Sequence, residues 1–300
     1  MFFVTQNIST RDDLTGLLSL FKRGGTAPLI AIDHEGGSVQ RLREIHGCTR
    51  LPAARTMAAR FSPQAALERY HAAGKEVAAL GFNLVLGPVL DLDSPENRAI
   101  GRLKRSYSDD PERIAAYGLS YCRGFACAGL LCAVKHFPGH GRSSNDSHRG
   151  IADVSDSWSA TDLAPFRTLI AAPDAPPIVM VGHLRLDSVA ADRRPATVSP
   201  EIVTGLLRRE LGFQGVVMTD DIDMEAVSHK MDRKTAFIQA LAAGNDLIMI
   251  KNLFGYAPLL PRQAVKWVRA AIAQGLLTEA QVVSAASRVR SLRARLMQPH

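Results

Sequence analysis

Three histidines, a lysine and an aspartate lie within one short glycine-rich stretch, "KHFPGHGRSSNDSH", which runs from Lys135 to His148. Such a stretch is poor material for a hydrophobic core, because its ionisable groups would lose their water. Asp146 and His148 are separated by one residue, and in an extended segment residues i and i+2 project the same way. An aspartate beside a histidine sets the tautomer of the ring and raises its pKa, which gives an acid/base group near neutral pH. The alternative is an ordinary surface hydrogen bond.

A metal site is a second interpretation of the same stretch. His136, His140 and His148, together with the carboxylate of Asp146, offer nitrogen and oxygen ligands that suit zinc or iron. Pro138, Gly139 and Gly141 lie among these residues, however, and they break any helix that would align the rings on one face. We therefore favour the acid/base interpretation over the metal.

The stretch "AIDHEGGSVQRL" at 31–42 follows a predicted strand directly. Asp33 and Glu35 stand at the strand exit, two glycines allow the backbone to approach a ligand, and Arg41 follows shortly after. This combination suits hydrogen bonding to a hydroxyl-rich ligand. The alternative is a Gly-Gly turn with solvated charges.

A third chemical feature is "GVVMTDDIDMEA" at 215–226, an apolar strand that ends in Asp220 and Asp221. Because side chains alternate along a strand, we expect one carboxylate to face a pocket and the other to brace the following turn. Helix capping is the alternative, and it explains Asp221 or Asp223 better than Asp220. A strand-end aspartate with an acid/base histidine provides the nucleophile and proton donor of a retaining glycosidase, in which the two groups lie about 5–5.5 Å apart. Most such enzymes use two carboxylates, so the histidine would be a variant.

Alternating strand and helix patterns must position these groups. Several helix-like segments open on Ser, Asp or Pro and close on Gly, which are the usual start and stop signals. The alternation predicts a parallel sheet, and the nearly continuous apolar strands predict burial on both faces. The predicted strands are 1–5, 28–33, 83–91, 130–136, 177–183, 215–220 and 246–251.

Polar residues at the strand ends distinguish a barrel from an open sheet. The strand-end residues are Asp33, Asp91, Lys135, His136, His183, Asp220 and Lys251. Ionisable groups at nearly every strand end are typical of the top face of a (β/α)₈ barrel, whereas an open doubly wound sheet collects them at one switch point. We therefore predict a single-domain α/β barrel over 1–300. It has one strand fewer than the eight required, so either a strand is hidden or the first strand–helix unit is missing and the barrel has an open seam.

The composition is that of a soluble globular chain, with 46% hydrophobic and 22% charged residues. The net charge of +7 comes from scattered basic residues, which argues against nucleic acid as a partner but favours anionic substrates. No apolar run reaches the roughly 18 residues of a membrane span, and the start lacks a secretory signal. We therefore expect a cytoplasmic protein without a membrane partner.

The cysteines, Cys48, Cys122, Cys127 and Cys132, include three that are spaced five apart. This spacing fits neither a paired zinc motif nor a disulfide framework. We expect buried free thiols in a reducing compartment.

Seven motifs in order carry a resemblance to a known family: "IDHEGGSVQRL", "LPAARTM", "NLVLGPVLDLD", "RSYSDDPE", "VKHFPGHGRSSNDSH", "PATVSPEIVTGLLRRELGFQGVVMTDDIDMEA" and "ALAAGNDLIMI". Together they resemble glycoside hydrolase family 3, and specifically its β-N-acetylglucosaminidase branch, the peptidoglycan-recycling β-hexosaminidases. The resemblance covers about residues 1–255 and leaves 256–300 as C-terminal helices. It implies the N-terminal (β/α)₈ barrel domain of that family.

The resemblance also implies roles for individual residues. Asp220 would be the nucleophile that forms a covalent glycosyl-enzyme, and His148 the proton donor and acceptor, assisted by Asp146. The implied ligands of the terminal N-acetylglucosamine are Asp33, Arg41, Arg105, Lys135 and His136. Because "RL" is inserted just before the motif that contains Arg105, Arg102 is an alternative to it.

The implied activity is that of a cytoplasmic retaining exo-β-N-acetylglucosaminidase. It would hydrolyse terminal β-1,4-linked N-acetylglucosamine from muropeptide fragments in cell-wall recycling, as a monomer that needs no cofactor or metal. Three alternatives remain open. A phosphorylase is one, because a histidine acid/base repels phosphate less than a carboxylate does. An inactive sugar-binding truncated homologue is the second, because family members usually have one more strand and helix ahead of the first strand seen here. A metal-dependent hydrolase is the third.

Overall fold

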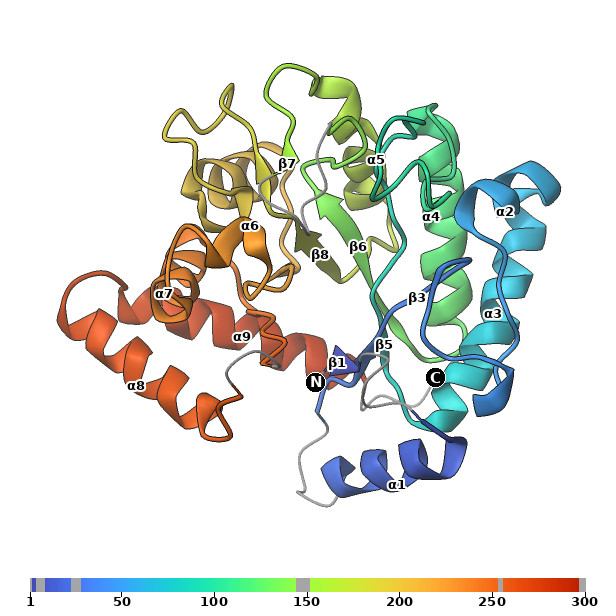
Figure 1. The fold of residues 1–300 in the computed structure, drawn as a ribbon, viewed down its shortest axis with the longest axis horizontal. Coiled ribbons are helices and arrows are strands. Elements are labelled where there is room, and N and C mark those ends of the chain that lie inside the picture. The colour runs from blue at the N-terminus through green and yellow to red at the C-terminus, as the bar shows by residue number, and fades with distance from the viewer. Residues whose placement is uncertain (1, 4–8, 23–27, 144–151, 253–255, 297–300) are drawn as a thin grey trace.

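A computed structural model describes residues 2–3, 9–22, 28–143, 152–252 and 256–296 (Figure 1). At its centre is a parallel sheet with the order β1-β2-β5-β6-β8-β10. Its strands are β1 (Phe2–Phe3), β2 (Ala31–Ile32), β5 (Leu84–Val85), β6 (Leu131–Phe137), β8 (Ile178–Val181) and β10 (Val216–Thr219). Leu247 continues the order through a parallel bridge to Met218. Strands that follow one another in chain order are characteristic of a (β/α)₈ barrel, so the predicted α/β fold class is confirmed.

Several strands are shorter than the sequence predicts. The predicted strand 83–91 pairs regularly only over β5, because Pro88 has no N–H to donate and pairing resumes as a single bridge between Val89 and Lys135. The segment 246–251 contributes one bridge rather than a full strand. Among the described residues, no pairing joins this segment to β1.

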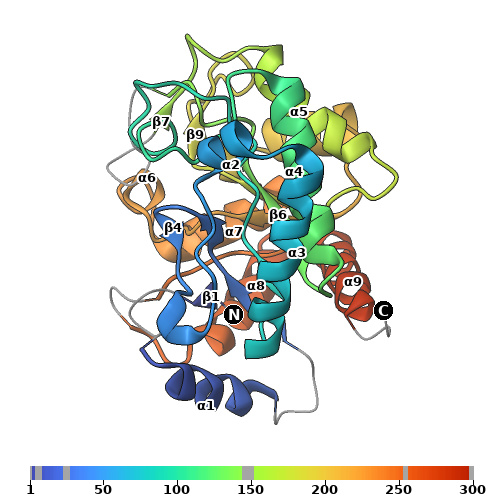
Figure 2. The ribbon, with the colours of Figure 1, turned by 90° about the vertical axis from the view of Figure 1, so that its right-hand side faces the viewer.

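Helices follow the strands and cover the sheet. Their bounds are α1 (Arg11–Lys22), α2 (Ala54–Arg60), α3 (Pro63–Leu80), α4 (Pro111–Ala126), α5 (Ala160–Ala171), the π-helical η5 (Glu201–Glu210), α6 (Glu225–Ser228), α7 (Arg233–Ala243), α8 (Leu260–Ala273) and α9 (Glu279–Arg295). Helix α3 begins where Ser62 accepts a hydrogen bond from the Ala65 amide and ends at Gly81, whose φ of 104° favours glycine. Figure 2 shows α3 and α4 side by side along the sheet. No helix in the described ranges combines the length and the apolar character of a membrane span.

Short elements connect this framework to the site. They are the 3₁₀ turns η2 (Glu44–His46) and η4 (Ala196–Val198), the hairpin β3 (His34–Gly36) with β4 (Val39–Gln40), and the parallel pair β7 (Ala152–Asp153) with β9 (Leu184–Arg185).

Both faces of the sheet are buried, as the apolar strands predict. Alternate strand residues such as Val134 and Val179 pack under the helices, while Ala133 and Ile178 belong to a second apolar cluster on the other face. Leu292 of α9 completes that second cluster. Side chains alternate along a strand, so strands buried on both sides need apolar residues at every position.

The prediction of buried free thiols is wrong in pairing for two of the four cysteines and in burial for a third. Cys122 of α4 and Cys132 of β6 form a disulfide, with Cα atoms 5.6 Å apart. Helix α4 packs against β6, so Cys122 near the end of the helix lies next to Cys132 near the start of the strand. The spacing of cysteines along the sequence does not reveal this contact. Cys48 is a buried free thiol as expected, whereas Cys127 is free but exposed.

Candidate active site

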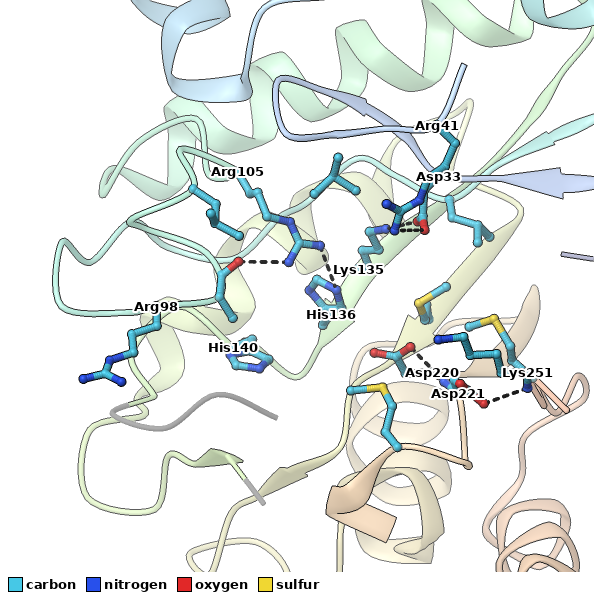
Figure 3. A pocket seen from close by; sticks show the side chains of 17 residues that line it. Asp33, Arg41, Arg98, Arg105, Lys135, His136, His140, Asp220, Asp221 and Lys251 are labelled. Carbon is cyan, nitrogen blue, oxygen red and sulfur yellow. Dashed lines mark hydrogen bonds and ion pairs between the residues drawn. The ribbon is translucent and has the colours of Figure 1, made fainter. Parts of the chain in front are cut away.

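A cavity of about 310 Å³ lies at the carboxyl ends of the central strands (Figure 3). Every predicted site residue that the structure describes lines it: Asp33, Arg41, Arg105, Lys135, His136 and Asp220. Arg105 lines the cavity and the exposed Arg102 does not. Asp146 and His148 lie outside the described residues. The carboxyl ends of the parallel strands therefore bring the predicted residues together at one edge of the sheet.

Lys135, Asp33 and Glu35 form a buried charge network at one side of the cavity. The Lys135 Nζ atom lies 3.0 Å from Asp33 Oδ1 and 2.6 Å from Glu35 Oε1. Arg105 donates two hydrogen bonds of 2.8 Å to the carboxylate of Glu35, and Arg41 lies 3.4 Å from Asp33. Burial raises the pKa of Glu35, but Arg105 and Lys135 outweigh it and hold the pKa far below its usual range. These charge-assisted hydrogen bonds hold the side chains in place and form a polar wall of the cavity.

The Glu35 carboxylate is expected to stabilise the fold. Glu35→Gln should lower the free energy of unfolding by about 3–5 kcal/mol, because it leaves Arg105 buried without its counter-charge. Since the folded-state pKa of Glu35 is lowered, this contribution is present above its unfolded pKa of about 4.3 and is lost as the pH falls. Urea unfolding measures the change. The control is Glu210→Gln, which removes an exposed ion pair with Arg167 and should cost at most about 1 kcal/mol. Equal losses in both variants would contradict the role of the network.

Asp91 orients His136. The fully buried carboxylate accepts a 2.7 Å hydrogen bond from His136 Nδ1, and it also accepts from the backbone amides of His136 and His140. Because an ionised carboxylate only accepts, Nδ1 carries the proton, and Nε2 is left facing Arg105 at 3.5 Å. Burial lowers the pKa of the neighbouring His140 to about 4, so its ring is neutral near pH 7.

Asp220 follows β10 and points into the cavity (Figure 3). Its amide donates to the Val181 carbonyl at 2.9 Å, and its Oδ1 atom accepts a 2.8 Å hydrogen bond from the amide of Asp221. Burial raises the pKa of Asp220, but His183, His136, the Asp221 amide and Lys135 together hold it below its usual value. The carboxylate is therefore ionised at neutral pH, as a nucleophile requires.

Asp221 departs in part from the alternation expected along the strand. It braces the turn as predicted, since its Oδ1 atom accepts from the amides of Lys251 at 2.9 Å and Asp223 at 3.1 Å. It also lines the cavity beside Asp220, because β10 ends at Thr219 and strict alternation ends with it. Burial raises its pKa to about 6.

Three further residues were absent from the predicted site. Glu35 was expected only, together with Asp33 and Arg41, to suit a hydroxyl-rich ligand, and it pairs with Arg105 and Lys135. His183 was noted only as a strand-end group. Arg98 lines the edge of the cavity, and no sequence signal distinguished it from other surface arginines. Within the described ranges, no group of three or more potential ligands could hold a metal ion, although two residues of the predicted metal set lie outside those ranges.

Comparisons with known proteins agree with this geometry. The family model described as glycosyl hydrolase family 3 N terminal domain matches residues 7–292, which extends beyond the expected resemblance and includes α8. A β-hexosaminidase of Stenotrophomonas maltophilia (strain R551-3) is 40% identical over 257 residues, which are 82% of this chain and 73% of that protein. β-Hexosaminidase LpqI of Mycobacterium tuberculosis is 37% identical over 256 residues, which are 81% and 64% of the two chains.

Solved structures show the same relationship. A family 3 β-N-acetylglucosaminidase from Paenibacillus sp. superimposes with a TM-score of 0.90 at 33% identity; the match covers 99% of this chain and 56% of that one. A β-N-acetylhexosaminidase from Beutenbergia cavernae gives a TM-score of 0.88 at 29% identity, with 98% and 88% covered. The chain thus spans about half of the Paenibacillus protein and most of the Beutenbergia one. It belongs to glycosyl hydrolase family 3, a family of glycoside hydrolases.

Proposed function

We propose that the chain is a retaining exo-β-N-acetylglucosaminidase that removes terminal β-1,4-linked N-acetylglucosamine from peptidoglycan fragments in cell-wall recycling. The observation that carries this proposal is the ionised Asp220 aimed into a cavity whose wall is the network of Lys135, Asp33 and Arg105. The names of two relatives, β-hexosaminidase and β-N-acetylglucosaminidase, support N-acetylglucosamine as the sugar.

The reaction has two steps. In the first, Asp220 attacks the anomeric carbon while His148 protonates the leaving oxygen, and a covalent glycosyl-enzyme forms. In the second, His148 removes a proton from water, which attacks the same carbon and releases Asp220. Oδ1 of Asp220 is engaged by the Asp221 amide, so the other oxygen is the attacking atom. Asp146 sets the tautomer of His148. Asp33, Arg41, Arg105, Lys135 and His136 bind the sugar hydroxyls.

Product analysis tests the proposal. With a nitrophenyl N-acetylglucosaminide, ¹H NMR should detect β-N-acetylglucosamine before the α anomer, and the corresponding glucoside should react far more slowly. Early α anomer would reject retention. Formation of sugar 1-phosphate only when inorganic phosphate is present would identify a phosphorylase. Binding of N-acetylglucosamine without turnover would identify an inactive homologue. Loss of activity on addition of a chelator would identify a metal-dependent hydrolase.

The cytoplasmic location and the monomeric state remain predictions. The disulfide is more typical of an oxidising compartment.

A peptidoglycan fragment carries carboxylates on its leaving group, and Arg98 suits such a charge. It is exposed at the edge of the cavity farthest from Asp221 (Figure 3), and the described part of the chain offers it no hydrogen-bond or ion-pair partner. The segment that carries it is hydrogen-bonded to the segment after β6. Asn97 donates to the carbonyls of His140, Gly141 and Ser143, and it accepts from two amides of its own turn. Leu103 adds an exposed apolar side chain to the cavity lining.

Arg98→Met should raise KM about three- to fivefold for an N-acetylglucosaminide whose leaving group bears a carboxylate, since an exposed ion pair contributes at most about 1 kcal/mol. KM for a neutral nitrophenyl substrate should change little. Steady-state kinetics at two salt concentrations measure both values, and the difference should shrink at high salt. Arg102→Met is the matched control, because Arg102 is exposed on the same segment but does not line the cavity. An equal rise for both substrates would contradict charge recognition by Arg98.

A further inference from the structure

His183 contacts the backbone of the residue that follows Asp220 and is almost completely buried, with 1% of its surface exposed. It follows β8, the neighbour of β10 in the sheet. Its Nε2 atom lies 2.8 Å from the backbone oxygen of Asp221, and its Nδ1 atom lies 2.9 Å from Thr197 Oγ1. Because a carbonyl oxygen only accepts, Nε2 must donate to it. Nδ1 accepts from the hydroxyl of Thr197 in the neutral ring and donates to it in the protonated ring, so both contacts form in either state.

Thr197 is itself held in place. It belongs to η4 and is fully buried, and its carbonyl accepts a 2.9 Å hydrogen bond from Asn245 Nδ2. Asn245 is also buried, and it donates a second bond of 2.7 Å to the Ala240 carbonyl in α7. A continuous buried chain of hydrogen bonds thus runs from α7 through η4 and His183 to Asp221. The Oδ1 atom of Asn245 has no hydrogen-bond partner among the described residues, so the chain starts from its Nδ2 atom.

Asp221 is the point at which this chain meets the nucleophile. His183 holds its carbonyl, and the amides of Lys251 and Asp223 hold its carboxylate. With the residue fixed from both sides, its own amide is directed at Oδ1 of Asp220, at 2.8 Å. Reorientation of Asp221 would turn this amide away and free the carboxylate of Asp220 to rotate.

We propose that His183 is a positioning residue for the nucleophile: by holding the Asp221 carbonyl, it keeps the Asp221 amide on one oxygen of Asp220 and leaves the other oxygen aimed at the substrate. The inference rests on the proposed role of Asp220. A shift of about 1 Å in a reacting group costs up to about 100-fold in rate. Because the sugar is held by other side chains, the loss should appear in kcat and not in KM.

The closing experiment compares His183→Leu with His183→Gln. The leucine variant removes the donor to Asp221 and should lower kcat for a nitrophenyl N-acetylglucosaminide about 30- to 100-fold, with KM within about twofold. The terminal amide of glutamine restores a donor near the place of Nε2, and kcat should return to within about fivefold of the wild type. Thermal unfolding followed by circular dichroism confirms that each variant is folded.

His46 offers a matched control. It is a second buried histidine with two contacts, since its Nδ1 atom accepts from the Arg43 amide and its Nε2 atom lies 3.1 Å from the Ser9 carbonyl, but it does not line the cavity. His46→Leu should lower the melting temperature and leave kcat of the folded enzyme unchanged. An equal loss of kcat in His46→Leu and His183→Leu, or no rescue by His183→Gln, would overturn the inference.

A second experiment distinguishes failure of this inference from failure of the proposed function. In Asp220→Ala, azide replaces the missing nucleophile: its nitrogen forms the bond to the anomeric carbon as the leaving group departs with its electron pair, and an α-glycosyl azide results. His183→Leu should then have no further effect, so the azide-rescued rates of Asp220→Ala and of the double variant should agree within about twofold. If the azide-rescued double variant were slower than Asp220→Ala by the same factor of about 30- to 100-fold, the inference would be overturned. If Asp220→Ala keeps full activity, the proposed function fails instead.

Discussion

Asp220→Ala is expected to lower kcat for a nitrophenyl N-acetylglucosaminide by at least about 10⁴-fold, because it removes the carboxylate that forms the covalent intermediate. The structure supports this expectation with two features of Asp220. Its carboxylate lines the cavity, and neighbouring His183, His136 and Lys135 help to hold its pKa below the usual value although burial opposes them. Initial rates of nitrophenol release measure the change. Added azide should restore turnover as an α-glycosyl azide, which shows that only the nucleophile was lost.

Asp221→Asn is the matched control for this prediction. The side-chain oxygen of asparagine still accepts from the amides of Lys251 and Asp223, so the turn and the amide directed at Asp220 should survive. Activity should therefore remain within about tenfold of the wild type, since a braced turn keeps the nucleophile in place. If Asp220→Ala retained more than a small fraction of the wild-type rate, or if Asp221→Asn were equally inactive, the assignment of Asp220 would be wrong.

The convergence of the site could be predicted because it depends on topology. Parallel strands that follow one another in the chain bring their carboxyl ends to one edge, so residues as distant in sequence as Asp33 and Asp220 had to meet. The alternation of strand and helix was enough to establish this. No knowledge of side-chain contacts was required.

Contacts between residues far apart in sequence could not be predicted. The pairing of Arg105 with Glu35 across 70 positions depends on how the turn after β5 folds back over the cavity. The disulfide depends on the angle at which α4 crosses β6, and the contact from His183 to the Asp221 carbonyl depends on the backbone after β10. Hydrophobic periodicity carries no information on any of these contacts, because each depends on one particular backbone geometry.

His148→Ala is expected to separate substrates by the quality of their leaving groups. A dinitrophenolate leaves without protonation, so kcat/KM for the dinitrophenyl N-acetylglucosaminide should fall by less than about tenfold. An alkyl or sugar leaving group needs a proton, and for these substrates kcat/KM should fall by about 10²- to 10⁴-fold. The glycosyl-enzyme should also accumulate with the dinitrophenyl substrate, because its hydrolysis then lacks a general base. A burst of dinitrophenol followed by a slow steady state would show this accumulation.

The control for His148→Ala is His140→Gln. His140 belongs to the same glycine-rich stretch and lines the cavity. Burial lowers the pKa of His140 to about 4, so its ring carries no proton to donate near pH 7. His140→Gln should therefore slow good and poor leaving groups by the same factor, through the geometry of the wall alone. The wild-type profile of kcat/KM should decline at high pH as the acid form of His148 is lost, and this decline should vanish in His148→Ala. Equal losses on both kinds of leaving group in His148→Ala would show instead that the leaving oxygen takes its proton from another group, and Asp221, whose pKa is raised to about 6 by burial, would be the next to test.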